Sequence, residues 1–212
     1  MPTQTLELTV SALMDGDRVV VPQFWLGRDV EYRTDRKNNA LSAAEYNSQM
    51  TLPTLAEVRH AFFGGSNDYK QSALSKRGYG EWTSTFLQDG KRAIERPDNV
   101  AYRNGVWVVD GGKVTQVELP PDGWTLEYDK PTGFPSRTSQ KRKDAEAVFG
   151  DDTSYFYATR VGVRAVLRLF TLDDCGPFFV YALYGPDHRD SHFGGRACHR
   201  SEQGSERLAT PE

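Results

Sequence analysis

Residues 51–65 read TLPTLAEVRHAFFGG, and they carry the clearest local folding signal in the chain. Thr54 has the side chain of a helix N-cap, and Glu57 stands three residues later, which is the spacing of a capping box. Gly64 and Gly65 follow the apolar run, and glycine is typical of the position just beyond a helix. The stretch therefore predicts a helix that begins at Thr54 and ends at the glycine pair.

Outward from this helix, the chain predicts an α+β fold in which helices come early and strands dominate late. A short helix is expected toward the end of residues 32–50, and another over 139–150, with Ser139 as its N-cap and Gly150 at its end. Two or three helices are thus expected in total. Apolar runs predict strands at 5–10, 18–27, 154–160, 162–170 and 176–184.

Residues 91–128 predict β-hairpins. Asp110, Gly111 and Gly112 stand between two β-rich arms, which is a strong turn signal. The two arms are therefore expected to pair with each other across this turn.

Composition limits the kind of protein. The 212 residues are enough for one domain with a hydrophobic core, and a formal net charge of −3 gives no reason to expect a nucleic-acid partner. No run is apolar and long enough to span a bilayer, and MPTQTLELTV at the N-terminus lacks the basic start and apolar core of a signal peptide. We expect a protein made in soluble form. The sequence leaves its location open, with virion association and the cytoplasm before display as alternatives. Cys175 and Cys198 are expected to be buried thiols, with a bridge between them as the alternative.

The residue types change abruptly near the C-terminus. Between Ala147 and Ser201 there is no Lys, Glu, Gln, Met or Trp, although their share of the whole chain predicts about nine. Burial explains the gap in the strand VGVRAVLRLF, because buried strands avoid Lys, Glu and Gln. It does not explain YGPDHRDSHFGGR at 184–196, whose polar residues are only Asp, His, Arg and Ser. Burial alone therefore does not account for the whole pattern.

Three stretches resemble the formylglycine-generating-enzyme branch of the C-type lectin fold, and they occur in its order and spacing. TLPTLAEVRHAFFGG is similar to that branch's Leu-Pro-Thr-x-Ala-Glu helix ending in Gly-Gly, and YGEWTS, with Glu81 and Trp82, is similar to its Glu-Trp-Thr segment. Val-Leu-Arg at 166–168, followed about thirty residues later by Gly195 and Arg196, is similar to its ending. The resemblance covers about 50–200.

This resemblance implies a domain organisation. It implies a single C-type-lectin-like domain over 1–202, with hairpins inserted at about 91–135 and a flexible tail at 203–212. The diversified C-terminal part discussed below would be about 153–200.

The chain departs from the enzymes of this branch. They carry Gly-Gly-Ser after the arginine, where this chain has Leu169, Phe170 and Thr171. Their copper-binding cysteine pair would fall at about 174 and 179, which are Asp174 and Phe179 here. Because those thiolates are missing, we expect a non-catalytic protein.

Variable proteins of diversity-generating retroelements use the same branch, and the missing residue types fit their chemistry. These elements randomise adenines in the DNA for the C-terminal part, mostly in Asn codons of the form A-A-pyrimidine. Such codons can never become Lys, Glu, Gln, Met or Trp codons, and Asn itself does not occur after Asn104. The resemblance therefore implies a receptor-type protein that binds a protein or another surface ligand without a cofactor.

On this interpretation, exposed side chains vary while a scaffold holds them. Tyr and Phe give large contact areas at low entropy cost, and Asp, His and Arg tune the charge. The residues expected to vary and to bind ligand are Leu169, Phe170, Leu172, Asp173, Asp174, Tyr181, Leu183, Tyr184, His188, Asp190, His192 and Phe193. The residues expected to be structural scaffold are Trp82, Arg168, Gly195 and Arg196.

Two other kinds of site have partial support in the sequence. His188 and His192 have the spacing of a metal pair on a helix, which would suit a metal- or cysteine-dependent enzyme of the same branch, but helix breakers surround them. A calcium lectin commonly coordinates sugar through Asn and Glu oxygens, which the C-terminal part lacks before the tail. A structural calcium ion stays an alternative. His60, on the predicted helix at 51–65, is expected to be structural.

Overall fold

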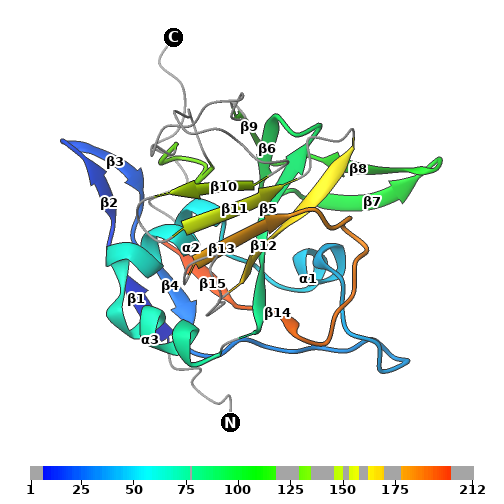
Figure 1. Cartoon of the computed structure of the whole chain (residues 1–212), viewed down its shortest axis with the longest axis horizontal. Coiled ribbons are helices and arrows are strands. Elements are labelled where there is room, and N and C mark those ends of the chain that lie inside the picture. Colours follow the sequence, from blue (N-terminus) through cyan, green and yellow to red (C-terminus); the bar gives the residue numbers. More distant parts are fainter. Residues whose placement is uncertain are drawn as a thin grey trace.

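A mixed sheet of eight strands runs through the middle of the molecule (Figure 1). The computed structural model describes residues 7–76, 78–117, 129–134, 146–149, 153–157, 162–169 and 178–201. The strand order along the sheet is β10 (Glu146–Phe149), β11 (Thr153–Tyr157), β13 (Phe178–Ala182), β12 (Val163–Leu169), β5 (Gly80–Gln88), β6 (Arg92–Glu95) and β9 (Lys113–Gln116). The eighth strand, β14 (Phe193–Gly195), pairs with β5.

The long strand β5 is the centre of this sheet, and all but its last residue are buried. It pairs antiparallel with β12 and β6, and parallel with the short β14. The pairing with β12 shifts register between Ala165 and Leu167, which marks a β-bulge. The only other parallel pair among the described strands is β11 with β13.

Smaller sheets complete the β structure. β1 (Glu7–Val10), β4 (Phe24–Gly27) and β15 (Cys198–Arg200) form a sheet of three, so that the last described strand lies beside an early one. Two hairpins stand apart from the large sheet: β2 (Leu13–Asp15) with β3 (Arg18–Val21), and β7 (Asn99–Arg103) with β8 (Val106–Asp110).

Three α-helices begin at side-chain caps. α1 (Ala43–Gln49) has a capping box of Ser42 and Glu45, and α2 (Leu55–His60) has the predicted box of Thr54 and Glu57. A π-helical turn, η1 (Ala61–Gly65), ends α2 at the expected glycines. The third helix, α3 (Asn67–Ser75), begins at Ser66 and was not predicted.

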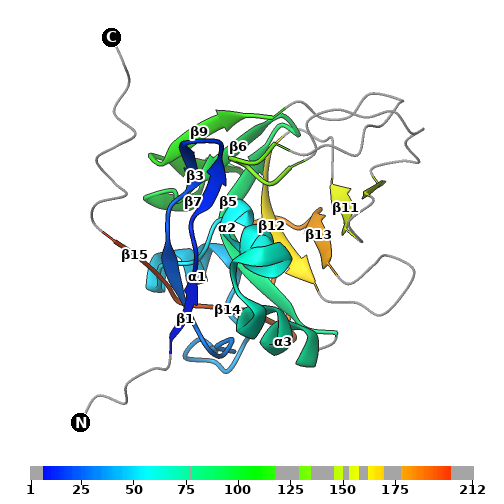
Figure 2. The ribbon, with the colours of Figure 1, turned by 90° about the vertical axis from the view of Figure 1, so that its left-hand side faces the viewer.

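The two faces of the large sheet bury separate cores. Figure 1 shows α2, α3 and the β1–β4 region to the left of β5, and α1 with the β7–β8 hairpin to its right. In the turned view of Figure 2, α2 and α3 lie in front of β5. The first core joins residues of α2, α3, β1 and β4 to one sheet face, and the second joins α1 to residues such as Trp82 and Leu167.

The α+β class is confirmed, with mostly antiparallel strands and three α-helices. The helix expected over 139–150 is wrong for 146–149, which form β10 paired with β11. The rest of that prediction, including Ser139 and Gly150, lies outside the described residues, as does the tail at 203–212.

The hairpin expected around Asp110, Gly111 and Gly112 is also wrong. The arms are strands, but β8 pairs with β7 and β9 pairs with β6. β6 and β9 therefore extend the large sheet, and within 91–135 only the β7–β8 hairpin forms a separate unit among the described strands.

Candidate ligand-binding surface

Residues 183–192 connect β13 to β14 and pass close to α1 (Figure 1). Near the middle of this segment, the Ala44 N–H donates to the carbonyl of Pro186 at 3.0 Å. At its end, the Gly80 N–H donates to the carbonyl of His192, also at 3.0 Å. These backbone bonds hold the segment in place and satisfy its polar groups, so its side chains are presented from a fixed base.

An aromatic row runs along this segment, and it consists of Phe179, Tyr181, Tyr184, His188 and Phe193. The ring centroids of Phe179 and Tyr181 are 5.6 Å apart, and those of Tyr181 and Tyr184 are 5.0 Å apart. The imidazole of His188 stacks on Tyr184 at 3.8 Å, with ring planes 9° apart. Phe193 lies 6.0 Å from His188. Such contacts contribute about 0.5–1.5 kcal/mol each beyond burial, so the row stabilises its own arrangement.

Trp82 supports the row from below. Its fully buried ring meets Phe193 edge-on at 5.5 Å and Tyr184 at 6.4 Å. The neighbouring Gly80 leaves the space they need, because a Cβ there would stand 2.8 Å from a methyl of Leu169 and 3.0 Å from the Phe193 ring. β5 thus positions the aromatic row in two ways. The Trp82 ring contacts the row, and Gly80, which has no side chain, leaves space for it.

A second aromatic group, the Tyr79 group, consists of Tyr32, Tyr79 and His192. The rings of Tyr32 and Tyr79 are 5.4 Å apart, as are those of Tyr79 and His192. Tyr32 and Tyr79 are 40% and 39% exposed, so their rings are available for contact with a partner. Because His192 and Phe193 are adjacent in sequence, the two groups meet where the segment enters β14.

Tyr32, Tyr181 and Tyr184 are neutral hydrogen-bond donors on this surface. Burial, followed by the charge of Glu81, raises the pKa of Tyr32 to about 12. Burial also raises the pKa of Tyr181 and of Tyr184. Their hydroxyls therefore stay protonated at physiological pH, which suits polar contacts within an apolar surface.

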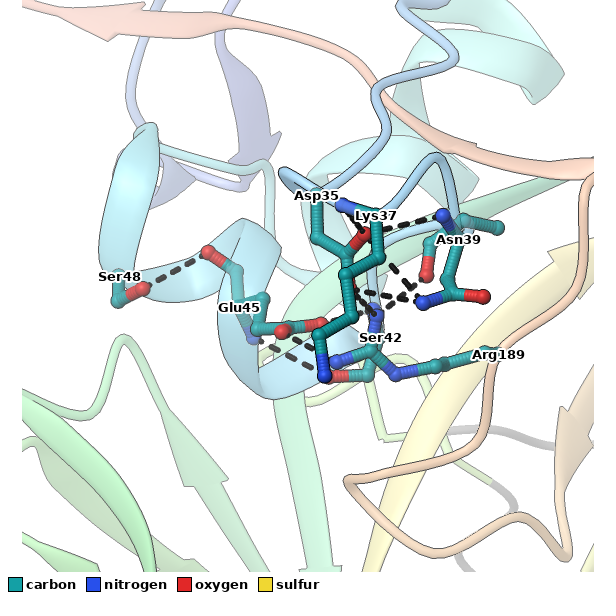
Figure 3. A network of polar contacts seen from close by, with 8 residues as sticks. Asp35, Lys37, Asn39, Ser42, Glu45, Ser48 and Arg189 are labelled. Atoms are coloured by element: carbon teal, nitrogen blue, oxygen red, sulfur yellow. Dashed lines mark hydrogen bonds and ion pairs between the residues drawn. The ribbon is translucent and has the colours of Figure 1, made fainter.

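Arg189 ties the segment to α1 (Figure 3). One Nη atom lies 3.2 Å from an Asp35 carboxylate oxygen and donates to the carbonyl of Ala40 at 2.8 Å. The other donates to Glu45 Oε1 at 2.5 Å, while Glu45 Oε2 accepts from the Ser42 N–H. The carboxylate of Glu45 thus takes part in the cap of α1 and also binds Arg189 of the segment 183–192.

Asp190 shapes the turn that precedes β14. Its carboxylate accepts from the backbone N–H of His192 at 2.8 Å and lies 3.0 Å from His192 Nδ1. Burial alone would raise the pKa of Asp190, but the hydrogen bonds from His192 outweigh it and lower the pKa. Asp190 therefore stays ionised and fixes the neighbouring imidazole.

Beneath this surface lies a buried charge network centred on Glu81. Its Oε1 accepts from Arg168 at 2.6 Å and from Arg196 at 2.7 Å, and its Oε2 accepts from the Tyr69 hydroxyl at 2.9 Å. Burial alone would raise the pKa of Glu81, but the two guanidiniums outweigh it and lower the pKa to about 2. Glu81 is thus a carboxylate that joins β5, β12, α3 and the residue after β14.

Arg196 extends this network to the small sheet. Its Nη1 donates to the carbonyls of Gly27 and Arg28 at 2.7 and 2.5 Å. Its guanidinium also lies 5.0 Å from the centre of the Tyr69 ring, which is a cation–π contact. Arg196 therefore fixes the chain just beyond the candidate surface.

The residues expected from the sequence divide by burial. The four scaffold residues, Trp82, Arg168, Gly195 and Arg196, are all buried. Of those expected to bind ligand, His192 is exposed, and the half-buried ones are Leu169, Tyr181, Leu183, Tyr184, His188 and Asp190. Phe193 is 7% exposed and is the one buried residue of this set in the part of the chain that the structure describes. Phe170, Leu172, Asp173 and Asp174 lie outside the described residues.

Sequence reasoning missed Tyr32, Tyr79 and Arg189. The Tyr79 group joins segments more than forty residues apart in the chain, and no local pattern shows such a contact. Arg189 carried a usable signal, since it was a lone cation between aspartates in a segment already chosen as the site.

No metal centre emerges from the part of the chain that the structure describes, where no three His, Cys, Asp or Glu side chains cluster suitably for an ion. His188 instead stacks on Tyr184, and His192 pairs with Asp190. Cys198 is a buried free thiol, and burial raises its pKa. Across the same described residues, no helix has the length and apolar character to cross a membrane.

Comparisons with known proteins do not place the chain in a family: no family model, no curated protein and no solved structure matches it.

Proposed function

We propose that this protein is a non-catalytic, receptor-type binding protein with a C-type lectin fold of the formylglycine-generating-enzyme branch. Its C-terminal surface would be diversified by a diversity-generating retroelement. The ligand would be a protein or another surface, held by the aromatic row, the Tyr79 group and the polar residues of 183–192.

One observation carries this proposal: Lys, Glu, Gln, Met and Trp are missing even from the exposed positions of the C-terminal part. Asp187, Arg189, Ser191 and His192 are exposed, yet the whole stretch from 147 to 201 avoids Lys, Glu and Gln. Exposed positions normally carry these residues often, so burial is not the cause here. Randomised Asn codons would leave this gap at exposed and buried positions alike.

The contacts of the motif residues support the fold assignment. The three stretches that resemble the lectin branch lie far apart in sequence, but Glu81 of the second contacts Arg168 and Arg196 of the third. Glu57 of the first, in the capping box of α2, pairs with Arg200 just beyond the third, at 2.5 and 2.7 Å. Three motifs that are each weak alone thus meet through two buried carboxylates.

The arrangement suits a binding surface that changes without unfolding its support. Tyr181 and Tyr184 pack against the second core, and His188 stacks on Tyr184. Trp82, which contacts Tyr184, comes from β5, outside the diversified part. Rigid aromatic side chains lose little entropy on binding, and polar neighbours adapt hydrogen bonds to each partner. A paratope-like site of this kind requires no cofactor.

The enzyme alternative has less support. A metal- or cysteine-dependent enzyme needs a reactive thiolate or several metal ligands. The thiol of Cys198 is buried with a raised pKa, so it is not poised as a nucleophile.

The neighbouring DNA tests the proposal. We expect a near-copy of the gene's 3′ end that differs from the gene only where the copy has adenine, together with a reverse-transcriptase gene. Sequencing the flanking region checks both. A flank with neither feature would sink the retroelement assignment and leave a plain binding domain.

A further inference from the structure

A cavity of about 310 Å³ lies between the β2–β3 hairpin and the β6–β9 edge of the large sheet. None of its described lining residues belongs to the aromatic row or to the Tyr79 group. Its size is at the lower end of the range for small-molecule sites. Its apolar walls are formed by Val20, Val21, Pro22, Phe24, Ala56 and Pro131.

The carboxyl group of Glu95 is buried against this cavity. Glu95 is 3% exposed, and its Oε1 has no hydrogen-bond partner among the described residues. Burial raises its pKa, with Lys113 and Arg96 only partly offsetting the effect. A buried acceptor without a donor is unfavourable, and a ligand that supplies the donor would remove that cost.

Two exposed cations also line the cavity. Lys113 stands directly opposite Glu95 in the pairing of β9 with β6, and Arg96 follows Glu95 in the chain. Within the described part of the chain, neither cation forms an ion pair. The cavity therefore offers a buried acid, two cations without described ion-pair partners and apolar walls.

The backbone around these groups is held in unusual conformations. Arg96 has a left-handed φ of 51°, and its N–H donates to the carbonyl of Ser84 at 2.7 Å. Gly112 also has a left-handed φ, and a Cβ there would lie 2.8 Å from the carbonyl oxygen of Glu95. A non-glycine residue such as Arg96 persists in this conformation only where the surroundings enforce it, and such residues cluster at ligand sites.

Other contacts fix the walls. Lys130, the neighbour of Pro131, pairs with Asp15 of the β2–β3 hairpin at 2.8 Å. Glu57 and Arg200, which also line the cavity, neutralise each other. Each of these ion pairs joins a wall of the cavity to a neighbouring part of the fold.

We propose that this cavity binds a small zwitterion of the amino-acid type with an apolar side chain. Its ammonium group donates to Glu95, its carboxylate lies between Arg96 and Lys113, and its side chain packs against Val21 and Phe24. This site is independent of the diversified surface.

Isothermal titration calorimetry on the full chain tests the site with three probes that share a phenyl group. L-phenylalanine has both charged groups, phenethylamine lacks the carboxylate and hydrocinnamate lacks the amine. We expect L-phenylalanine to bind at least tenfold more tightly than either of the others. If none of the probes binds at millimolar concentration, or phenethylamine binds as tightly as L-phenylalanine, the proposal is wrong.

Two variants assign the groups. Glu95→Gln should weaken L-phenylalanine and phenethylamine at least tenfold and leave hydrocinnamate unchanged, whereas Lys113→Ala should weaken L-phenylalanine and hydrocinnamate. Glu31→Gln, at an exposed carboxylate outside the cavity lining, serves as the control and should change none of them. Circular dichroism verifies that each variant is folded. Equal affinities in the folded Glu95→Gln and wild-type proteins would overturn the proposal.

Discussion

Glu81 is the residue on which the candidate surface depends most. It is the one carboxylate that contacts both Arg168 and Arg196 in the described structure, and all three side chains are buried. Replacing such a group by apolar residues can be harmless, but removing only one partner leaves a buried charge without compensation. The network therefore makes Glu81 hard to substitute alone.

We predict that Glu81→Gln lowers the free energy of unfolding by about 3–5 kcal/mol, because it removes the buried negative charge that both guanidiniums contact. Urea unfolding at neutral pH measures the change. Glu31→Gln is the matched control, since its ion pair with Arg33 is exposed, and it should change stability by less than about 1 kcal/mol.

The same carboxylate predicts a pH dependence. Its folded pKa of about 2 lies below the ordinary value of 4.5, so the stabilisation is present above about pH 4.5 and is lost as pH falls toward 2. Urea unfolding across this range should show wild type losing stability to acid more steeply than Glu81→Gln. Parallel acid profiles for the two proteins would contradict the role given to Glu81.

At the level of elements, helix caps could be predicted from the sequence, whereas the pairing of strands could not. The cap of α2 was predicted because its box spans only four residues, and the box of α1, which was not predicted, has the same local spacing. The turn at Asp110 was misread because β8 and β9 each find a better partner elsewhere, while Asn104 and Gly105 make the turn of the β7–β8 hairpin.

Two further errors have physical reasons. Residues 146–149 have helix-favouring Glu and Ala, but pairing with β11 overrides that weak preference. α3 was missed because its sequence, NDYKQSALS, has few apolar residues to show a helical period, although Ser66 was an available N-cap signal.

The turn at 110–112 allows a matched test. Gly112 and Gly105 have similar φ values of 83° and 84°, but a Cβ on Gly112 would meet backbone atoms whereas one on Gly105 would meet nothing within 4 Å. We predict that Gly105→Ala costs about 1 kcal/mol from backbone strain alone, and that Gly112→Ala costs clearly more. Thermal unfolding compares them, and equal losses would contradict the close packing at 112.

Arg189 is predicted to order the segment 183–192. Arg189→Ala should speed amide hydrogen exchange in residues 186–193 and 35–42, because the ties to Asp35 and Glu45 are lost. Global stability should change little, since these ion pairs are substantially exposed. Arg33→Ala, which removes an ion pair within one short segment, should leave exchange in 186–193 unchanged.

At the scale of the whole molecule, the candidate site joins parts of the chain that sequence patterns treat separately. The missing residue types in 147–201 predicted where the candidate site lies, and the three lectin-like motifs predicted its scaffold residues. The contribution of Tyr32 and Tyr79 could not be predicted, because it depends on how the 31–42 loop packs beside β14. Long-range packing, not local propensity, completes the surface.

The central claim is that exposed and half-buried side chains of residues 183–192 change while the buried scaffold stays. A library that randomises Leu183, Tyr184, His188, Asp190 and His192 with adenine-mutated Asn codons tests it directly, through the protease resistance of the displayed variants. We predict that most members stay folded, whereas most members of a matched library at Trp82, Arg168, Gly195 and Arg196 do not. Equal loss of folded protein in the two libraries would contradict the account.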